Sequence, residues 1–149
     1  MHILLGETAN DIRDIFLSTF IDMECSYYQE RIANMVQFSD GMCYTGYLWD
    51  CLVKKERVSY QYAVNWIEAS PGTIYILWDI HSCERIRIPD YWKYPKNSVL
   101  SIKSAEIGTI ISTLPEDCYF FDESLSWAFA FTHEESKPGR KLCYLSTRP

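Results

Sequence analysis

The hydrophobic pattern of this 149-residue chain changes its period at Pro71-Gly72, and that change constrains the fold more than any other feature. Before this point, apolar side chains recur at the intervals of one helix face. Directly after it, Thr73–Trp78 is a β-branched and aromatic run of strand length. Helices first and antiparallel strands later are typical of the α+β class. The length suits a single core, so we predict one globular domain over residues 1–149.

The first half predicts helices. Thr8 and Asp11 have the spacing of a capping box, and apolar positions then repeat at helical intervals. Residues 9–38 are therefore expected to form one bent helix or two consecutive helices. A short helix is predicted near residues 47–52, and Ser59 is placed to cap another helix that stops before Pro71-Gly72.

The second half predicts a mainly antiparallel sheet with a C-terminal three-strand meander. We expect Thr73–Trp78 to be a central strand, and Ile86 and Ile88 alternate with arginines as in an edge strand. Residues 99–102 are expected to pair, and a helix is predicted over residues 107–114, before Pro115. The predicted strands of the meander are 118–122, 127–132 and 141–145.

The charge of the chain bears on its partners. The formal net charge is −6, and the first fifty residues carry eight acidic side chains against two basic ones. Nucleic acid is not expected as a partner, because binding to phosphates requires a strong positive footprint. A basic protein suits this charge better.

The sequence also predicts a compartment. It contains neither the pattern of a secretory signal nor an apolar stretch near the roughly 20 residues that cross a bilayer, so we expect a cytoplasmic protein without membrane contact. The six cysteines are scattered singly, without C-x-x-C pairs, and are expected to be reduced.

One cluster suggests chemistry. Asp79 and His81 follow one predicted strand, and His133 and Glu134 end another, so neighbouring strands would bring them into a metal or acid/base site. The zinc-protease motif H-E-x-x-H is absent, because Lys137 stands where the second histidine is needed. We predict no catalytic residue, cofactor or metal, with a small metal-dependent hydrolase using this cluster as the alternative.

Aromatic residues make up 15% of the chain, and Tyr and Trp are enriched at protein interfaces. A proline-flanked loop holds three of them beside lysines, and two acidic pairs flank the last strands. We predict that aromatic anchors and acidic side chains bind a protein partner. The predicted contact residues are Tyr91, Trp92, Tyr94, Asp122, Glu123, Glu134 and Glu135. The alternative is that the aromatic rings pack beneath the sheet and the acids are a solvated rim.

Four pieces of the chain carry a resemblance: GYLWD at 46–50, WDIHS at 78–82, LPEDCYFFD at 114–122, and residues 127–134. Together they resemble small bacterial proteins of the immunity type, over the last two thirds of the chain. The resemblance implies a non-enzymatic protein that binds and blocks one cognate toxin domain, often a basic nuclease. It supplies no catalytic residues. A regulatory or adaptor domain with a different partner is a further interpretation.

Overall fold

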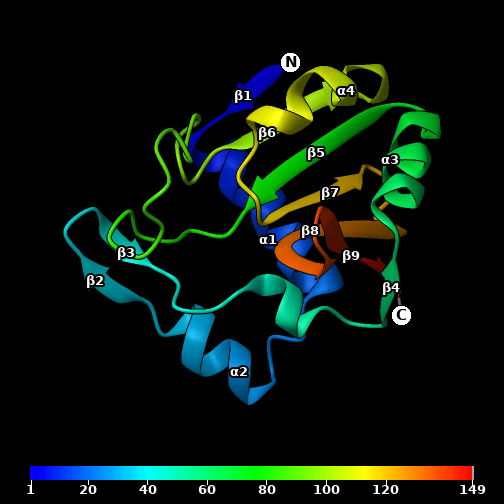
Figure 1. The fold of residues 1–149 in the computed structure, drawn as a ribbon. Helices are drawn as coiled ribbons and strands as arrows, with labels where there is room; N and C mark the ends of the chain where they lie inside the picture. The colour runs from blue at the N-terminus through cyan, green and yellow to red at the C-terminus, as the bar shows by residue number, and fades with distance from the viewer. Residues whose placement is uncertain (149) are drawn as a thin grey trace.

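The computed structural model describes residues 1–148, whose seven-stranded sheet is covered by helices on both faces (Figure 1). All neighbouring strands of this sheet are antiparallel. In spatial order the strands are β1 (His2–Leu4), β6 (Val99–Lys103), β5 (Thr73–Trp78), β7 (Cys118–Asp122), β8 (Trp127–Lys137), β9 (Arg140–Thr147) and β4 (Lys55–Val58). A separate hairpin pairs β2 (Val36–Phe38) with β3 (Gly41–Cys43). The predicted α+β class is confirmed.

The helical segments are short except for two. They are α1 (Gly6–Phe20), α2 (Ser26–Tyr28) with the π-helical η1 (Gln29–Ala33), η2 (Leu48–Cys51), α3 (Tyr60–Ala69), η3 (Ser104–Glu106), α4 (Ile107–Ile110) and η4 (Ile111–Thr113). Within residues 1–148, no helix is both long and apolar enough to cross a membrane.

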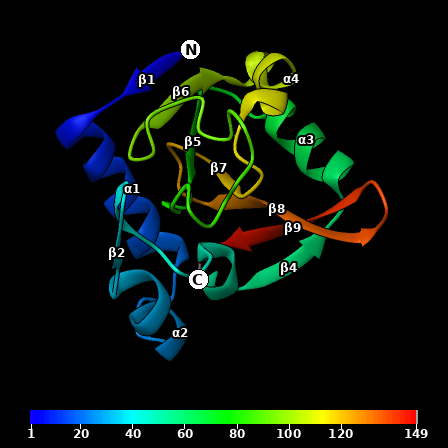
Figure 2. The same ribbon diagram turned by 60° about the vertical axis from the view of Figure 1, so that its left-hand side comes forward.

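Two cores lie on opposite faces of the sheet. Alternation along β7 sends Tyr119 and Phe121 to one face and Phe120 to the other. The first core is covered by α1 and the segment around η2, and the second by α3 and α4. Figure 2 shows α1 and α3 on opposite sides of the sheet. Both faces of the central strands are buried, which explains their continuous apolar runs.

The strand predictions of the second half are largely confirmed. β5 has neighbours on both sides, and β7, β8 and β9 form the predicted meander. Helix α3 is capped as predicted, because the Ser59 hydroxyl accepts a hydrogen bond from the backbone N–H of Tyr62.

The prediction for residues 9–38 is partly wrong. Helix α1 begins at Gly6 after Leu5, which makes no side-chain capping bond, so Thr8 is not its cap. The second helical stretch ends at Ala33, and residues 36–38 form a strand instead. Gly41, at φ +114°, begins the return strand, a conformation that favours glycine.

Ile86 and Ile88 do not form the predicted edge strand, since residues 79–98 form an irregular loop. Asp40 ties this loop to the β2–β3 hairpin: its carboxylate contacts the Lys96 ammonium and accepts hydrogen bonds from the Ser82 hydroxyl and the Cys83 N–H. These contacts, that of Lys96 foremost, hold the pKa of Asp40 well below its ordinary value. The loop is thus ordered by a distant carboxylate and not by strand pairing.

All six cysteines are free thiols, and burial raises the pKa of both Cys51 and Cys143 to about 12. Cys83 is exposed. We expect a thiol reagent to modify Cys83 first in the native protein, because reactivity requires access and the thiolate form. In denaturant without reductant the same titration should count six thiols, and four or fewer would contradict the reduced state.

Candidate binding site

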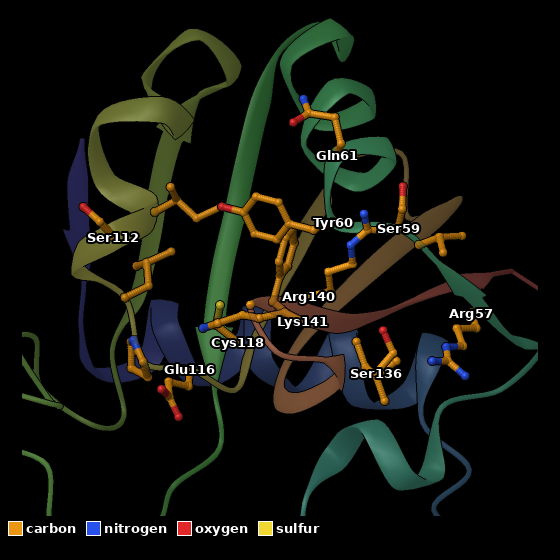
Figure 3. Close-up of a pocket in the computed structure, with 17 residues that line it drawn as sticks. Arg57, Ser59, Tyr60, Gln61, Ser112, Glu116, Cys118, Ser136, Arg140 and Lys141 are labelled. Atoms are coloured by element: carbon orange, nitrogen blue, oxygen red, sulfur yellow. The ribbon is translucent and has the colours of Figure 1, made fainter.

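A cavity of about 750 Å³ opens at one end of the second core (Figure 3). Its walls are the start of α3, the segment from η4 to β7, and the β8–β9 hairpin. Cys118, the first residue of β7, pairs with Phe131, but β8 continues to Lys137. The hairpin therefore projects past the end of β7, and this overhang forms one wall. The volume is in the range of sites that bind small ligands or peptide side chains.

The inner surface of the cavity is apolar. Phe131, Leu114 and Leu142 line it, together with Ile111 and Cys118. Burial raises the pKa of the Cys118 thiol, so this group remains neutral and behaves as an apolar one. An apolar group that enters the cavity would remove this surface from water, which favours binding.

Three cations surround this apolar surface: Arg57, Arg140 and Lys141. In the described part of the chain, none of the three forms a salt bridge. Figure 3 shows Arg140 and Lys141 on the hairpin, on the side that faces Tyr60 of α3. Glu116 is the one acidic lining residue, and the site is therefore basic on a chain that is acidic overall.

A row of exposed aromatic side chains on α3 continues from the cavity. Tyr60, Tyr62 and Trp66, called the aromatic row below, are 37%, 47% and 36% exposed. Each also rests on a ring of β8. The ring-centroid distances are 5.5 Å for Tyr60–Phe131, 6.4 Å for Tyr62–Phe129 and 6.3 Å for Trp66–Trp127. The rings are fixed on one side and free on the other, as interface anchors are.

The acidic residues predicted as contacts do not form one surface. Asp122 ends β7 and Glu123 follows it, before the start of β8, whereas Glu134 and Glu135 lie toward the far end of β8. Glu123, Glu134 and Glu135 are exposed. Asp122 is only 9% exposed, and its carboxylate accepts bonds from the Ser124 N–H and the Trp127 indole N–H. The expected surface position of Asp122 is wrong, because it stabilises the β7–β8 turn.

We expect Asp122→Lys to lower the free energy of unfolding by about 1 to 3 kcal/mol, because the buried indole N–H of Trp127 loses its acceptor. Glu123→Lys, at the exposed neighbour, should change stability by less than about 0.5 kcal/mol. Urea unfolding of the two variants measures the difference. Equal stabilities would contradict a structural role for Asp122.

The predicted aromatic contacts are mostly part of the fold. Tyr91 is buried, and its hydroxyl donates to Asp117 at 3.5 Å. Trp92 and Tyr94 are half-buried against the second core, and Lys96 lies 4.3 Å from the centroid of a Trp92 ring. The expectation that the loop exposes all three rings is wrong for Tyr91, for which the alternative of inward packing holds.

Asp79, His81 and His133 lie in one region, where the Tyr47 ring contacts both histidines, but each of the three is bonded to a different partner. Asp79 accepts bonds from the Leu48 N–H at 2.9 Å and the Tyr119 hydroxyl at 2.8 Å. Burial raises the pKa of Asp79 well above its ordinary value. His81 Nε2 lies 2.7 Å from the Gly46 carbonyl oxygen, and Glu134 is exposed. Within residues 1–148, no three His, Cys, Asp or Glu side chains are grouped so that they could hold a metal.

Asp117 is a buried residue that the sequence analysis did not single out. Its carboxylate accepts from the Trp49 indole N–H at 3.1 Å and from the backbone N–H of His133 at 3.0 Å, and it contacts Nδ1 of His133 at 3.0 Å. An irregularity in the β8–β9 pairing after Phe131 re-aims this part of β8. The sequence could have indicated this contact, because Asp117 directly precedes the predicted strand 118–122. Antiparallel pairing of that strand with β8 places Asp117 beside residues 132–133.

Together these bonds define a buried network, made of Asp79, His81, Asp117, Tyr119 and their partners in the segment 46–49. Its members come from residues 46–50, 78–82 and 114–122. The network holds the segment around η2 against the sheet, on the face opposite α3.

Acidification should destabilise the fold through His81. Burial lowers the pKa of His81 below the ordinary imidazole value, and the bond to Gly46 offsets this only in part. Below about pH 6.5 the unfolded chain takes up a proton that the native chain does not, so stability falls by up to about 1.4 kcal/mol per pH unit. The stabilisation from His81 is fully present above about pH 6.5 and is lost as the pH falls toward the lowered pKa of His81.

Urea unfolding between pH 7.5 and 5.5 tests this, with His81→Gln as the comparison. The raised pKa of Asp79 makes the fold more stable as the pH falls, and it does so in both proteins. The difference between their slopes of unfolding free energy against pH therefore reports on His81. Equal slopes in the parent and in His81→Gln would show that His81 does not cause the loss of stability in acid.

Searches of protein-family models, of curated proteins and of solved structures find no match to this chain.

Proposed function

We propose that this chain is a non-enzymatic binding protein that recognises a protein partner through α3 and the neighbouring cavity. The observation that carries the proposal is the continuity of the aromatic row with a cationic cavity, since Tyr60 belongs to both. Tyr, Trp and Arg are the residues that most often supply binding energy at protein interfaces.

The aromatic row is suited to binding because its rings are already held in place. Trp66 packs on Phe129 at 5.7 Å and pairs with Tyr62 at 5.9 Å between ring centroids. Little side-chain freedom remains to be lost on association, so more of the interaction energy appears as affinity.

The bonding of the titratable groups supports binding over catalysis. Asp79, Asp117 and His81 are buried and bonded to structural partners. Their bonds hold the segment around η2 in place, which favours a structural role for these three groups.

The partner we propose is a cognate bacterial toxin domain in the cytoplasm, with this chain as its immunity protein. The resemblance of residues 46–50, 78–82, 114–122 and 127–134 is the basis of this part of the proposal.

The test uses the protein encoded directly beside this gene, since an immunity gene normally lies next to that of its toxin. Co-expression should restore the growth of cells that produce the neighbouring protein, and the purified pair should associate. Trp66→Ala should weaken association about 30-fold or more, which corresponds to about 2 kcal/mol for an interface anchor.

Val36→Ala is the matched control, because Val36 is also exposed but lies on the separate β2–β3 hairpin and does not line the cavity. It should leave affinity unchanged, and melting curves should show both variants folded. Absence of both growth rescue and association would contradict the proposal.

A second candidate, a hydrolase, is favoured by one observation: His133 is partly exposed, and its Nδ1 is held by the buried Asp117. A carboxylate that orients an imidazole in this way is the arrangement of a general base. Hydrolysis of phosphodiester or ester substrates that is lost in His133→Gln, with the fold intact, would favour the enzyme.

A further inference from the structure

We propose that the cavity receives an acidic segment of the protein partner, with one aromatic or branched aliphatic side chain inserted between α3 and the β8–β9 hairpin. Its carboxylates then meet Arg57, Arg140 and Lys141. This inference rests on the proposed function and adds the chemistry of the recognised segment.

The apolar lining and the cations together define this ligand class. A free inorganic anion would satisfy the cations and leave the half-buried Leu114 and Leu142 in contact with water. An apolar group without charge would fill the lining and leave three cations unpaired. A segment that carries both groups satisfies both parts of the site.

The position of Lys141 supports an acidic ligand in the cavity. Figure 3 shows its side chain extended along the cavity beside Cys118, and its charge is close enough to lower the pKa of that thiol in part. No hydrogen bond or salt bridge of the Lys141 ammonium occurs within residues 1–148. A carboxylate arriving there gains an ion pair without having to displace an existing one.

The charge contrast within the chain adds selectivity. The lining carries three cations and one acid, whereas the whole chain has a net charge of −6. The remaining surface therefore repels an acidic segment, and the cavity attracts it. A segment of this kind can lie on a partner of either net charge.

The experiment uses the full chain and fluorescein-labelled eight-residue peptides, each with a central Phe flanked by Glu. Fluorescence anisotropy should show saturable binding. Replacing Phe by Ser, or the Glu residues by Lys, should weaken it at least tenfold. Raising the salt from 20 to about 300 mM should weaken it too, because surface ion pairs are screened.

On the protein side, the double change Arg140→Glu with Lys141→Glu should also weaken peptide binding at least tenfold. The matched control is Arg87→Glu with Lys103→Glu, which reverses two exposed cations outside the cavity. The control should bind as the parent does. Arg57→Glu, on the neighbouring strand β4, is a third variant outside the hairpin itself, and it should also weaken peptide binding.

Three outcomes would overturn the inference: no peptide binding, equal loss in the control, or binding of decanoate but not of the peptides, which would identify a small amphipathic acid as the ligand. Failure of the proposed function is distinguishable. If the neighbouring gene product binds and depends on Trp66 but not on Arg140 and Lys141, the proposed function stands and this inference fails. If the peptides bind as expected but that gene product does not, this inference stands alone.

Discussion

Replacing Trp127 by alanine is expected to lower the free energy of unfolding by about 3 to 5 kcal/mol, the range for large buried aromatic residues. The side chain is 5% exposed and lies between Phe129, at a ring-centroid distance of 5.5 Å, and Trp66 of α3. Its indole N–H also donates to the Asp122 carboxylate at 3.1 Å. The change would leave a cavity under α3 and a buried carboxylate oxygen without its donor.

Urea unfolding measures the effect, and Trp127→Phe separates its two causes. Phe retains most of the packing but cannot donate to Asp122, so Trp127→Phe should lower the free energy of unfolding by about 1 to 3 kcal/mol, as expected for an unpaired buried group. A loss under about 1 kcal/mol for Trp127→Ala would mean that the ring does not support α3.

Asp117→Ala should destabilise the chain by about 2 to 5 kcal/mol, because each buried donor left without its acceptor costs about 1 to 3 kcal/mol. The indole N–H of Trp49 and the backbone N–H of His133 would both lose their acceptor. Burial keeps water from replacing it, since Asp117 is almost fully enclosed. The segment around η2 should loosen before the rest of the fold.

Glu116→Ala is the matched control, because Glu116 is the exposed neighbour of Asp117 and forms no salt bridge within residues 1–148. It should melt within about 0.5 kcal/mol of the parent. Hydrogen exchange of residues 46–51 should rise selectively in Asp117→Ala. Unchanged exchange and unchanged stability would show that this carboxylate does not hold the segment.

The features that the sequence predicted correctly are those encoded locally. The run Thr73–Trp78 and the strands β7 and β8 are rich in β-branched or aromatic residues and are bounded by turn residues, and these preferences agree with the sheet environment. Ser59 precedes an apolar helical repeat, so the start of α3 was readable.

The errors occur where distant contacts decide the structure. Residues 36–38 continue a helical repeat of apolar positions but pair with β3, because the turn before Gly41 closes a hairpin that Asp40 fixes to a remote loop. Asp122 and Tyr91 lie in turn-like or loop-like sequence, which predicts surface positions, but both bond to buried groups. The partner of Asp122 is the Trp127 indole in the same hairpin, and that of Tyr91 is the remote Asp117.

The cavity was not predicted because its walls come from three distant segments, near residues 57–61, 111–118 and 131–142. In the sequence, no motif marks Arg57, Arg140 and Lys141 as members of one site. Their proximity depends on the overhang of β8 and β9 beyond β7, which results from unequal strand lengths. Strand length is the property that sequence patterns define least well.

The buried network and the aromatic row lie on opposite faces of the sheet, and this separation affects how freely the chain can change its specificity. Substitutions at Tyr62, Trp66, Arg57 or Arg140 alter side chains that the network does not touch. A library randomised at these four positions should therefore yield mostly folded proteins with divergent binding preferences. The residues on one face of the sheet can then change to recognise new partners, while the buried network on the opposite face keeps the fold stable.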